Sequence, residues 1–179
     1  MVDEQLLVER AKTDESAFAE LYEIYLPKIF AYITRRINDR DEAEDLVSNI
    51  FLRVVENIKG FNPSKSSFKT WIYTIATNMM IDFFRSNAKK KTCCIETAES
   101  VADTTLNPAE EAQNAEQKDK VFSAIRSLPE RHQKVLLLRY CSDLSIVETA
   151  AALGVTENNV SVIIHRALKA FELTYKKYV

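Results

Sequence analysis

Glycine and proline are scarce in this chain of 179 residues: two Gly and four Pro make 6 of 179, about 3 %, against the usual ~12 %. Gly60 and Gly154 lie 94 positions apart, so the chain cannot build a glycine-rich phosphate loop of the P-loop or dinucleotide-binding type. Architectures of many short strands need turns rich in glycine and proline. The composition therefore predicts an all-α fold.

A disulfide framework and long apolar runs are also lacking. No run of about 18 apolar residues occurs, and acidic residues crowd the first positions, where a signal peptide would be basic and then apolar. Cys93, Cys94 and Cys141 do not make a disulfide framework, and His132 and His165 are too far apart for a zinc spacing. We expect a cytoplasmic protein in a reducing environment, with incidental thiols, no membrane insertion, no metal and no cofactor.

The net charge is −2 over the whole chain, but the charges are segregated along it. Residues 1–58 hold 7 basic and 13 acidic side chains, a net charge of −6, and residues 59–94 hold 7 and 1, a net charge of +6. Residues 95–120 hold 2 and 7, a net charge of −5, and residues 121–179 hold 8 and 5, a net charge of +3. A sum near zero therefore does not exclude nucleic acid as a partner.

Apolar spacing in the first half predicts three helices that form one domain. The expected helices cover residues 15–36, about 38–58, and about 68–91. Pro27 predicts a kink in the first helix. Asp41 and Glu44 have the spacing of a capping box at the start of the second, and Gly60 ends it.

The second half is predicted to be a separate helical domain, residues 110–179, after an acidic flexible linker at 92–109. Residues 92–107 lose the apolar period and are rich in Thr, Ser, Ala and acids. Asn107 and Pro108 are typical of a helix start, and this helix runs to Leu128. A further helix begins at Pro129 and carries an apolar set that includes Tyr140.

The C-terminal stretch has the pattern of a helix-turn-helix. Ser145 and Glu148 form a capping box, Gly154 breaks the helix, and Thr156 caps the next one. The buried side of that last helix is expected to consist of Val160, Ile164, Ala167, Leu168 and Phe171.

The last helix leaves polar side chains on its other face, and these are candidates for reading duplex DNA. Amide, hydroxyl and imidazole groups can contact base edges, and cations suit phosphates. The candidates are Thr156, Glu157, Asn158, Asn159, Ser161, Val162, His165, Arg166 and Lys169. An ordinary αα-hairpin with a polar outer face would show the same pattern.

The basic block at 59–94 has seven cations and one acid, Asp82, with aromatic residues interleaved. Such a mixture suits unpaired nucleic-acid strands, because every base offers a face for stacking. The candidates are Lys59, Phe61, Asn62, Ser64, Lys65, Ser66, Lys69, Trp71, Tyr73, Asn78 and Arg85. Phe68 and Trp71 lie on the apolar side of their helix, so core packing is the competing interpretation of their rings.

The helix at 41–57 has the opposite character, with an acidic face unsuited to DNA. This face consists of Asp41, Glu42, Glu44, Asp45, Ser48, Asn49, Leu52, Arg53 and Glu56. It is either a solvated surface or a docking face for a basic protein partner.

These motifs resemble bacterial RNA polymerase sigma factors, most closely the extracytoplasmic-function (ECF) group. The resemblance to region 2 rests on Asp41-Glu-Ala-Glu-Asp-Leu-Val47, Phe51-Leu-Arg53, Phe68-Lys-Thr-Trp-Ile-Tyr-Thr-Ile-Ala-Thr-Asn78, Asp82 and Arg85. The resemblance to region 4 rests on Leu128-Pro-Glu-Arg-His132, Leu144 to Gly154 and Val160 to Ala167. It covers roughly 16–91 and 110–172, so residues 1–91 would form region 2 and residues 110–179 region 4.

The resemblance implies a non-enzymatic subunit that binds core RNA polymerase and directs promoter recognition, DNA melting and transcription initiation. It places the clamp coiled coil of the largest polymerase subunit against Asp45, Ser48, Asn49, Leu52 and Arg53. The unpaired −10 strand would lie on the basic block, and the −35 duplex on the last helix, with region 4 also packed on the polymerase flap. An anti-sigma factor is a usual partner of the group.

Several positions depart from the family pattern. Ser48 and Asn49 stand where the family commonly has Gln-Glu, Thr74 and Thr77 replace frequent arginines, and Ser161 and Ile163 replace a usual Lys and Arg. Binding to free DNA is therefore expected to be weak and useful only when the chain is tethered to polymerase. The rival interpretation is a stand-alone helix-turn-helix regulator, and an enzyme finds little support because no nucleophile has a plausible base.

Overall fold

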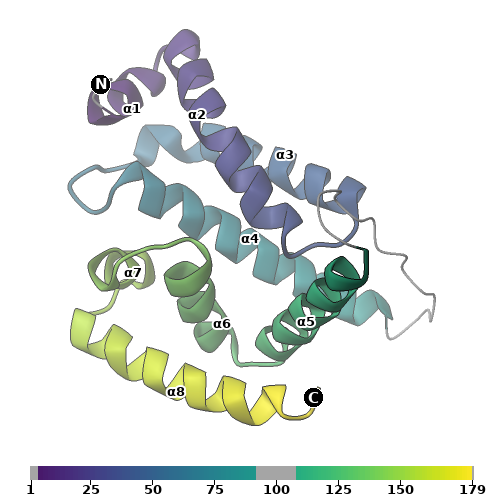
Figure 1. Ribbon diagram of the computed structural model, residues 1–179. Coiled ribbons are helices and arrows are strands. Elements are labelled where there is room, and N and C mark those ends of the chain that lie inside the picture. Colours follow the sequence, from purple (N-terminus) through teal and green to yellow (C-terminus); the bar gives the residue numbers. More distant parts are fainter. Residues whose placement is uncertain (1–3, 92–107, 179) are drawn as a thin grey trace.

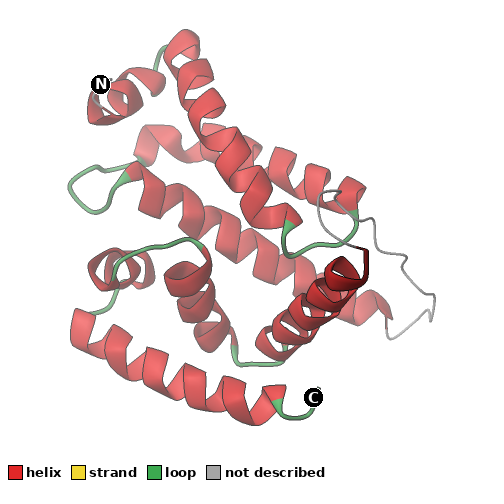
Figure 2. Cartoon of the chain, in the orientation of Figure 1, coloured by secondary structure: helices red, strands yellow, loops and turns green. Residues whose placement is uncertain are grey.

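The computed structural model describes residues 4–91 and 108–178, with the side chains of 88–91 and 108–115 left out of the description (Figure 1). Within these ranges the chain consists of helices and loops (Figure 2), which confirms the all-α prediction. The elements are α1 Glu4–Ala11, α2 Glu15–Thr34, α3 Arg40–Asn57, the 3₁₀-helix η1 Ile58–Gly60, α4 Phe68–Lys91, α5 Pro108–Arg126, α6 Glu130–Leu136, the π-helix η2 Leu137–Cys141, α7 Ile146–Leu153 and α8 Glu157–Tyr175. None of the described helices has the length and apolar character that a membrane crossing requires.

The first unit, α1 to α4, differs from the predicted one in two places. A short helix, α1, precedes the predicted ones and buries Leu7, Val8 and Ala11. The capping prediction for α3 is wrong: its N-cap is Asp39, whose side chain accepts a hydrogen bond from the backbone N–H of Glu42 at 2.9 Å. Both acid pairs have the same i, i+3 spacing, so spacing alone could not choose between them.

The helix-turn-helix is confirmed at α7 and α8. Ser145 and Glu148 form the capping box that begins α7, with hydrogen bonds of 2.8 and 3.1 Å. Gly154 adopts a left-handed conformation at φ 65°, and the Thr156 side chain accepts from the backbone N–H of Asn159 at 3.3 Å to cap α8. The two caps and the turn each depend on a few adjacent residues, so they could be predicted from the sequence.

The predicted buried side of α8 is partly wrong. Val160, Ile163 and Ala167 are buried, whereas Leu168 is 42 % exposed. Ile163 lies three residues after Val160 and four before Ala167, so these three share one face of the helix. Leu168 lies outside that face. Tyr140, which the sequence analysis places in the apolar set of the helix that begins at Pro129, is 55 % exposed.

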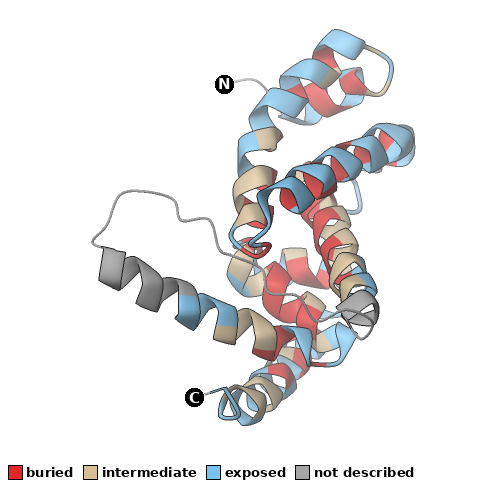
Figure 3. Ribbon diagram, turned by 90° about the vertical axis from the view of Figure 1, so that its right-hand side faces the viewer, coloured by how far each residue is buried: buried red, intermediate tan, exposed pale blue. Residues whose placement is uncertain are grey.

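Two apolar clusters hold the molecule together, and the larger one joins both halves of the chain. It contains buried residues of α1–α4, such as Ile72 and Met80, together with Ile125, Leu138 and Leu144 of the second half. The smaller cluster holds α6, α7 and α8 to each other, and its buried residues are Leu128, Val135, Leu136, Ala150, Val160, Ile163 and Ala167. Helices α6 and α7 therefore lie between α4 and α8, and buried positions concentrate where helices face each other (Figures 1 and 3).

Candidate nucleic-acid interface

The outer face of α8 presents every residue predicted to read duplex DNA. All nine, from Thr156 to Lys169, are exposed. Ser161 donates to the backbone oxygen of Glu157 at 3.2 Å, a weak bond that leaves its hydroxyl oxygen free to accept. Ile163 is buried at 5 % exposure, so a residue at this position points into the domain and not at DNA.

The predicted polymerase face of α3 is also exposed at all five positions: Asp45, Ser48, Asn49, Leu52 and Arg53. Leu52 is 60 % exposed and Val55 beside it 49 %. Arg53 forms an ion pair with Glu56 at 3.3 Å, and both side chains are largely exposed, so this pair adds little stability.

The loop at 61–67 projects polar groups from a buried aromatic base. Lys59, Asn62, Ser64 and Lys65 are exposed, and the Asn62 side chain accepts from the backbone N–H of Ser64 at 2.9 Å, which fixes the turn. Phe61 is buried at 5 % exposure. Its ring centroid lies 5.7 Å from that of Phe68 and 5.2 Å from that of Trp71.

The aromatic candidates of the basic block divide between core and surface. Phe68 is buried at 3 % exposure, as the competing core interpretation expected, and Trp71 is half-buried. Tyr73 is also buried, and its ring packs edge-on against Tyr32 at 5.2 Å. Of the three predicted stacking rings in this block, only Trp71 therefore keeps a partly open surface in this conformation.

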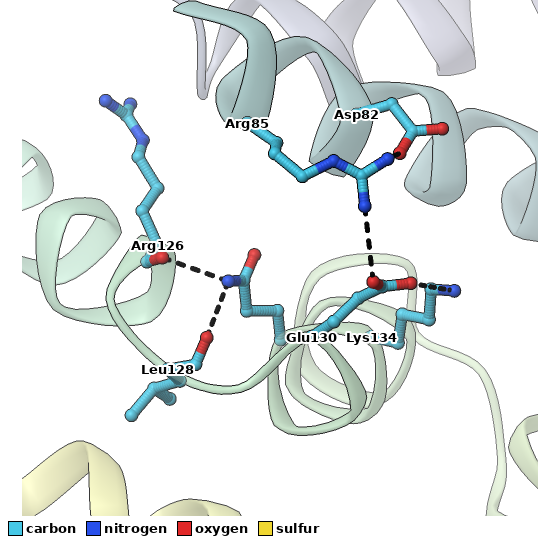
Figure 4. Close-up of polar contacts among 7 residues, drawn as sticks. Asp82, Arg85, Arg126, Leu128, Glu130 and Lys134 are labelled. Atoms are coloured by element: carbon cyan, nitrogen blue, oxygen red, sulfur yellow. Dashed lines mark hydrogen bonds and ion pairs between the residues drawn. The ribbon is translucent and has the colours of Figure 1, made fainter. Parts of the chain in front are cut away.

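The helical part of the basic block lies against the second half of the chain. Lys69 donates to the backbone oxygen of Asp143 at 3.5 Å, and an Arg85 nitrogen lies 3.6 Å from a Glu130 carboxylate oxygen (Figure 4). Asn78 lines a cavity of about 530 Å³ together with residues of α6 and α7. The structure therefore brings three of the predicted strand-binding residues, Lys69, Asn78 and Arg85, into or beside the contact between the two halves.

Arg36, which follows α2, is a central residue of this contact, and the sequence analysis did not single it out. It is buried at 5 % exposure, with its guanidinium carbon 4.0 Å from the Tyr32 ring centroid and 5.6 Å from that of Phe122 in α5. It donates to the backbone oxygens of Tyr32 and, at 3.2 Å, of Cys141. The i, i+4 spacing of Tyr32 and Arg36 was visible in the sequence, but the partners from the second half were not.

Burial also shifts the pKa of Tyr32, the tyrosine beside Arg36. Removal from water raises the pKa of the Tyr32 hydroxyl, although the nearby Arg36 guanidinium and the 2.8 Å hydrogen bond with Thr77 act the other way. Tyr32 is therefore a neutral, hydrogen-bonded core residue. Its ring attracts the Arg36 guanidinium beside it through a cation–π interaction.

Metal-binding chemistry finds no support in the described residues, where His, Cys, Asp and Glu nowhere form a group of three that could hold an ion. Cys141 is a half-buried free thiol. Cys93 and Cys94 lie outside the described residues.

Comparison with protein families matches two segments of the chain. Residues 21–90 match the family model of sigma-70 region 2, and residues 118–171 match that of sigma-70 region 4. Both segments fall within the predicted ranges, and they occur in the predicted order.

Curated relatives cover most of the chain. The ECF RNA polymerase sigma factor SigW of Bacillus subtilis is 32 % identical over 168 residues, covering 89 % of this chain and 89 % of the relative. SigX, an ECF sigma factor of the same organism, is 30 % identical over 159 residues, covering 87 % and 81 %.

Two solved structures share the fold. One is CnrH in complex with the cytosolic domain of CnrY, with a TM-score of 0.66, 19 % identity, and coverage of 97 % of each chain. The other is the sigma factor RpoE with the anti-sigma factor NepR from Bartonella quintana, with a TM-score of 0.59, 19 % identity, and coverage of 89 % of this chain and 96 % of that one.

Proposed function

This chain belongs to the ECF RNA polymerase sigma factors, and on that premise we propose a role for each of its three candidate surfaces. As a sigma factor it binds core RNA polymerase and directs transcription initiation at specific promoters. Residues 1–91 correspond to region 2 and residues 110–179 to region 4, with 92–109 as the linker. The finer assignments below rest on exposure, charge and chemistry.

The α3 face docks on polymerase. Asp45 and Arg53 supply charges of both signs, and Leu52 supplies an exposed apolar side chain between them. Such a mixture suits the clamp coiled coil of the largest subunit, because polar contacts fix the register and a central apolar residue loses its water on binding. Ser48 and Asn49 complete this face with neutral polar groups.

The loop and the start of α4 hold the unpaired −10 strand. Lys59 and Lys65 provide exposed cations for phosphates, and Trp71 provides a partly open ring for a base. A base held on such a ring offsets the stacking and pairing that it lost in the duplex. Melting therefore needs no nucleotide hydrolysis, and the chain carries no catalytic activity of its own.

The α8 face enters the major groove of the −35 element. Asn158 and Ser161 lie near the N-terminal end of the helix, the end that contacts base edges in helix-turn-helix proteins. Arg166 and Lys169 lie further along and contact phosphates. With only a few cations on this face, binding to free duplex is weak, and tethering to polymerase supplies the effective concentration.

The protein acts in the bacterial cytoplasm, where polymerase and promoters are. It has an anti-sigma factor as a further partner, a proposal supported by the ECF family and by the related RpoE, which was solved with such a factor.

The exposure of all five candidate residues on α3 and all nine on α8, on segments that match regions 2 and 4, carries this proposal. In vitro transcription with core polymerase tests it, with start sites mapped to find the upstream consensus. The double variant Asp45→Arg, Arg53→Glu is expected to lose association with core polymerase while its circular dichroism stays unchanged.

A matched control exchanges the exposed Glu172–Lys176 pair of α8 as Glu172→Lys, Lys176→Glu, which also changes two charges. This control is expected to co-purify with polymerase like the unmodified chain. Wild-type co-purification by the folded α3 variant would refute the docking assignment.

A further inference from the structure

We propose that α1 takes part in binding the unpaired −10 strand: its Glu4, acting through Tyr25 of α2, fixes the aromatic rings that carry the −10 loop (residues 61–67) and Trp71. Glu4 and Tyr25 are positioning residues, which act on the strand without touching it. The inference rests on the −10 role proposed for this loop and for Trp71. It adds a helix, Glu4–Ala11, that precedes the segment matching sigma-70 region 2, residues 21–90.

Helix α1 lies at the same end of the first unit as the −10 loop (Figure 1). It is anchored there by Leu7 and Val8, which are at most 2 % exposed. Val8 also lines a cavity of about 60 Å³ together with Pro63 of the loop and Phe68 at the start of α4. The helix and the loop are therefore direct neighbours, although they are far apart in the sequence.

Three aromatic side chains form the base of the −10 loop. Phe61 and Phe68 stand at its two ends, with ring centroids 5.7 Å apart and ring planes at 84°. The Trp71 ring centroid lies 5.2 Å from that of Phe61 and 5.5 Å from that of Phe68. Ring pairs at such distances favour edge-to-face or offset orientations. The orientation of the Phe68 ring therefore influences those of Phe61 and Trp71.

Tyr25 of α2 connects these rings to α1. Its ring centroid lies 5.1 Å from that of Phe68, with the planes at 71°, and its hydroxyl donates a hydrogen bond to the Glu4 carboxylate. Tyr25 is 3 % exposed, and a hydroxyl withdrawn from water needs a hydrogen-bond partner. Burial raises the pKa of this hydroxyl, and the bond to Glu4 raises it further, so Tyr25 remains a neutral donor. Glu4 thus fixes the Tyr25 ring, and Tyr25 fixes the Phe68 ring.

A fixed loop base strengthens strand binding. An unpaired strand gains stacking and phosphate contacts from the protein, and ordering a loop at the moment of binding subtracts from that gain. The half-buried Trp71 and the exposed Lys65 are the groups whose positions depend on this base. Loss of the bond between Glu4 and Tyr25 therefore lowers strand affinity and leaves the reading of duplex by α8 unchanged.

Two variants break the bond from opposite sides. Glu4→Ala removes the acceptor, and Tyr25→Phe removes the donor but keeps the ring. Glu4→Gln is a rescue variant, because its amide oxygen still accepts a hydrogen bond. One matched control, Glu9→Ala, removes from α1 another acid, which pairs with Lys12 at 2.7 Å. The other, Tyr22→Phe, removes the hydroxyl of an exposed tyrosine of α2.

Fluorescence of the free chain gives the first result, because Trp71 is the only tryptophan in the sequence. Acrylamide is expected to quench it about twofold more strongly in Glu4→Ala and Tyr25→Phe than in the wild type, since the ring loses its fixed neighbours. Glu4→Gln and both controls should be quenched like the wild type. Circular dichroism checks folding, and the exposed position of Glu4 provides a test that does not depend on the folding of the Tyr25 variant. Unchanged quenching in folded Glu4→Ala overturns the proposal.

Strand affinity of the holoenzyme gives the second result. The labelled template carries the −35 duplex and a single-stranded −10 segment, taken from a promoter mapped by transcription. Glu4→Ala and Tyr25→Phe are expected to bind it about threefold to tenfold more weakly than the wild type, while their affinity for a duplex with the −35 element alone stays within about twofold. The double variant should lose no more than the weaker-binding single variant, because all three lack the same bond. Additive losses, or equal losses on both templates, overturn the positioning role.

A further variant separates failure of this proposal from failure of the −10 assignment. Holoenzyme carrying Lys65→Ala, Trp71→Ala is expected to lose affinity for the same template. If that double variant binds like the wild type, the −10 assignment and the role of α1 are both overturned. If it binds weakly and Glu4→Ala binds like the wild type, only the role of α1 is overturned. Co-purification with core polymerase checks that every variant forms holoenzyme.

Discussion

Two helices of this sigma factor, α4 and α8, carry the residues that we propose bind DNA. These residues differ in how far they are exposed. On α8 every candidate residue is exposed, and the helix buries only a narrow seam of Val160, Ile163 and Ala167. On α4 the candidates include buried Tyr73, half-buried Trp71 and Asn78, and an Arg85 engaged with region 4. Polar residues on a helix thus mean a free reading surface only where no second layer packs on it.

The difference follows from position in the fold. Helix α8 is an outer element that packs on α5, α6 and α7 from one side. Helix α4 lies between α2 and α3 on one side and α6 and α7 on the other, so it has neighbours around most of its surface. Its buried polar residues, Thr70 and Thr77, lie among these neighbours and have hydrogen bonds.

The largest expected effect comes from weakening the apolar cluster that joins the unit α1–α4 to the unit α5–α8. Leu138→Ala should lower the free energy of unfolding by about 2–5 kcal/mol, because Leu138 is 1 % exposed in the shared cluster. Calorimetry should show two transitions in place of one, as region 4 loses its hold on α4. The control is Tyr140→Ala, which changes an exposed neighbour of Leu138. A shared core would be contradicted if the Leu138 variant unfolded in a single transition and lost less than about 0.5 kcal/mol in its free energy of unfolding.

A matched pair of asparagines compares the two DNA helices directly. Asn158→Ala on exposed α8 is expected to reduce discrimination at one −35 base pair by about 1–3 kcal/mol, if it loses a good base contact. Asn78→Ala on α4 should leave duplex binding unchanged and affect promoter melting by holoenzyme only. Binding to libraries of −35 duplexes measures the first effect, and permanganate footprinting of the −10 segment measures the second. Unchanged promoter selection by the Asn158 variant, and by Ser161→Ala as well, would argue against the α8 assignment.

Gly154 and Gly60 allow a similar comparison, of the stability cost of an alanine at a left-handed and at an ordinary backbone conformation. Gly154 has φ 65°, and an added Cβ would meet nothing within 4 Å, so Gly154→Ala should cost about 1 kcal/mol through conformation alone. Gly60 has the same open surroundings without a left-handed backbone, and Gly60→Ala should be neutral or slightly stabilising. Thermal unfolding of both variants checks this, and equal losses at the two positions would contradict it.

The smallest effect concerns the start of the helix-turn-helix. Hydrogen bonds from Ser145, led by its backbone N–H, hold the pKa of Glu148 below its usual range. Its stabilisation is complete above about pH 4.5 and is lost as pH falls through the lowered pKa. Gln can keep the capping-box hydrogen bond but not the charge at the helix N-terminus, so Glu148→Gln should cost about 0.3–1 kcal/mol at pH 7 and less at pH 3, as measured by urea unfolding at both values. A difference that grows toward acid would contradict this sign.

Much of the fold and of the site was available from local sequence. The Ser145–Glu148 capping box, the turn at Gly154 and the cap at Thr156 were all found, because each depends on residues within one or two turns. Helix α1 was missed because a short amphipathic segment has few periods to recognise. The α8 seam was misplaced by one position at Leu168, since neighbouring apolar residues fit the helical period equally well.

The sequence by itself determined an all-helical chain with an acidic face on α3, a basic stretch from Lys59 and a helix-turn-helix ending in α8. Charge, capping and apolar period are local properties, so they survive without knowledge of the partner helix. Only the tertiary structure decided that Arg36 meets Phe122 and Cys141, that Glu130 meets Arg85, and that α4 is covered while α8 is free. These contacts join residues from opposite halves of the chain, and their geometry depends on how whole helices pack.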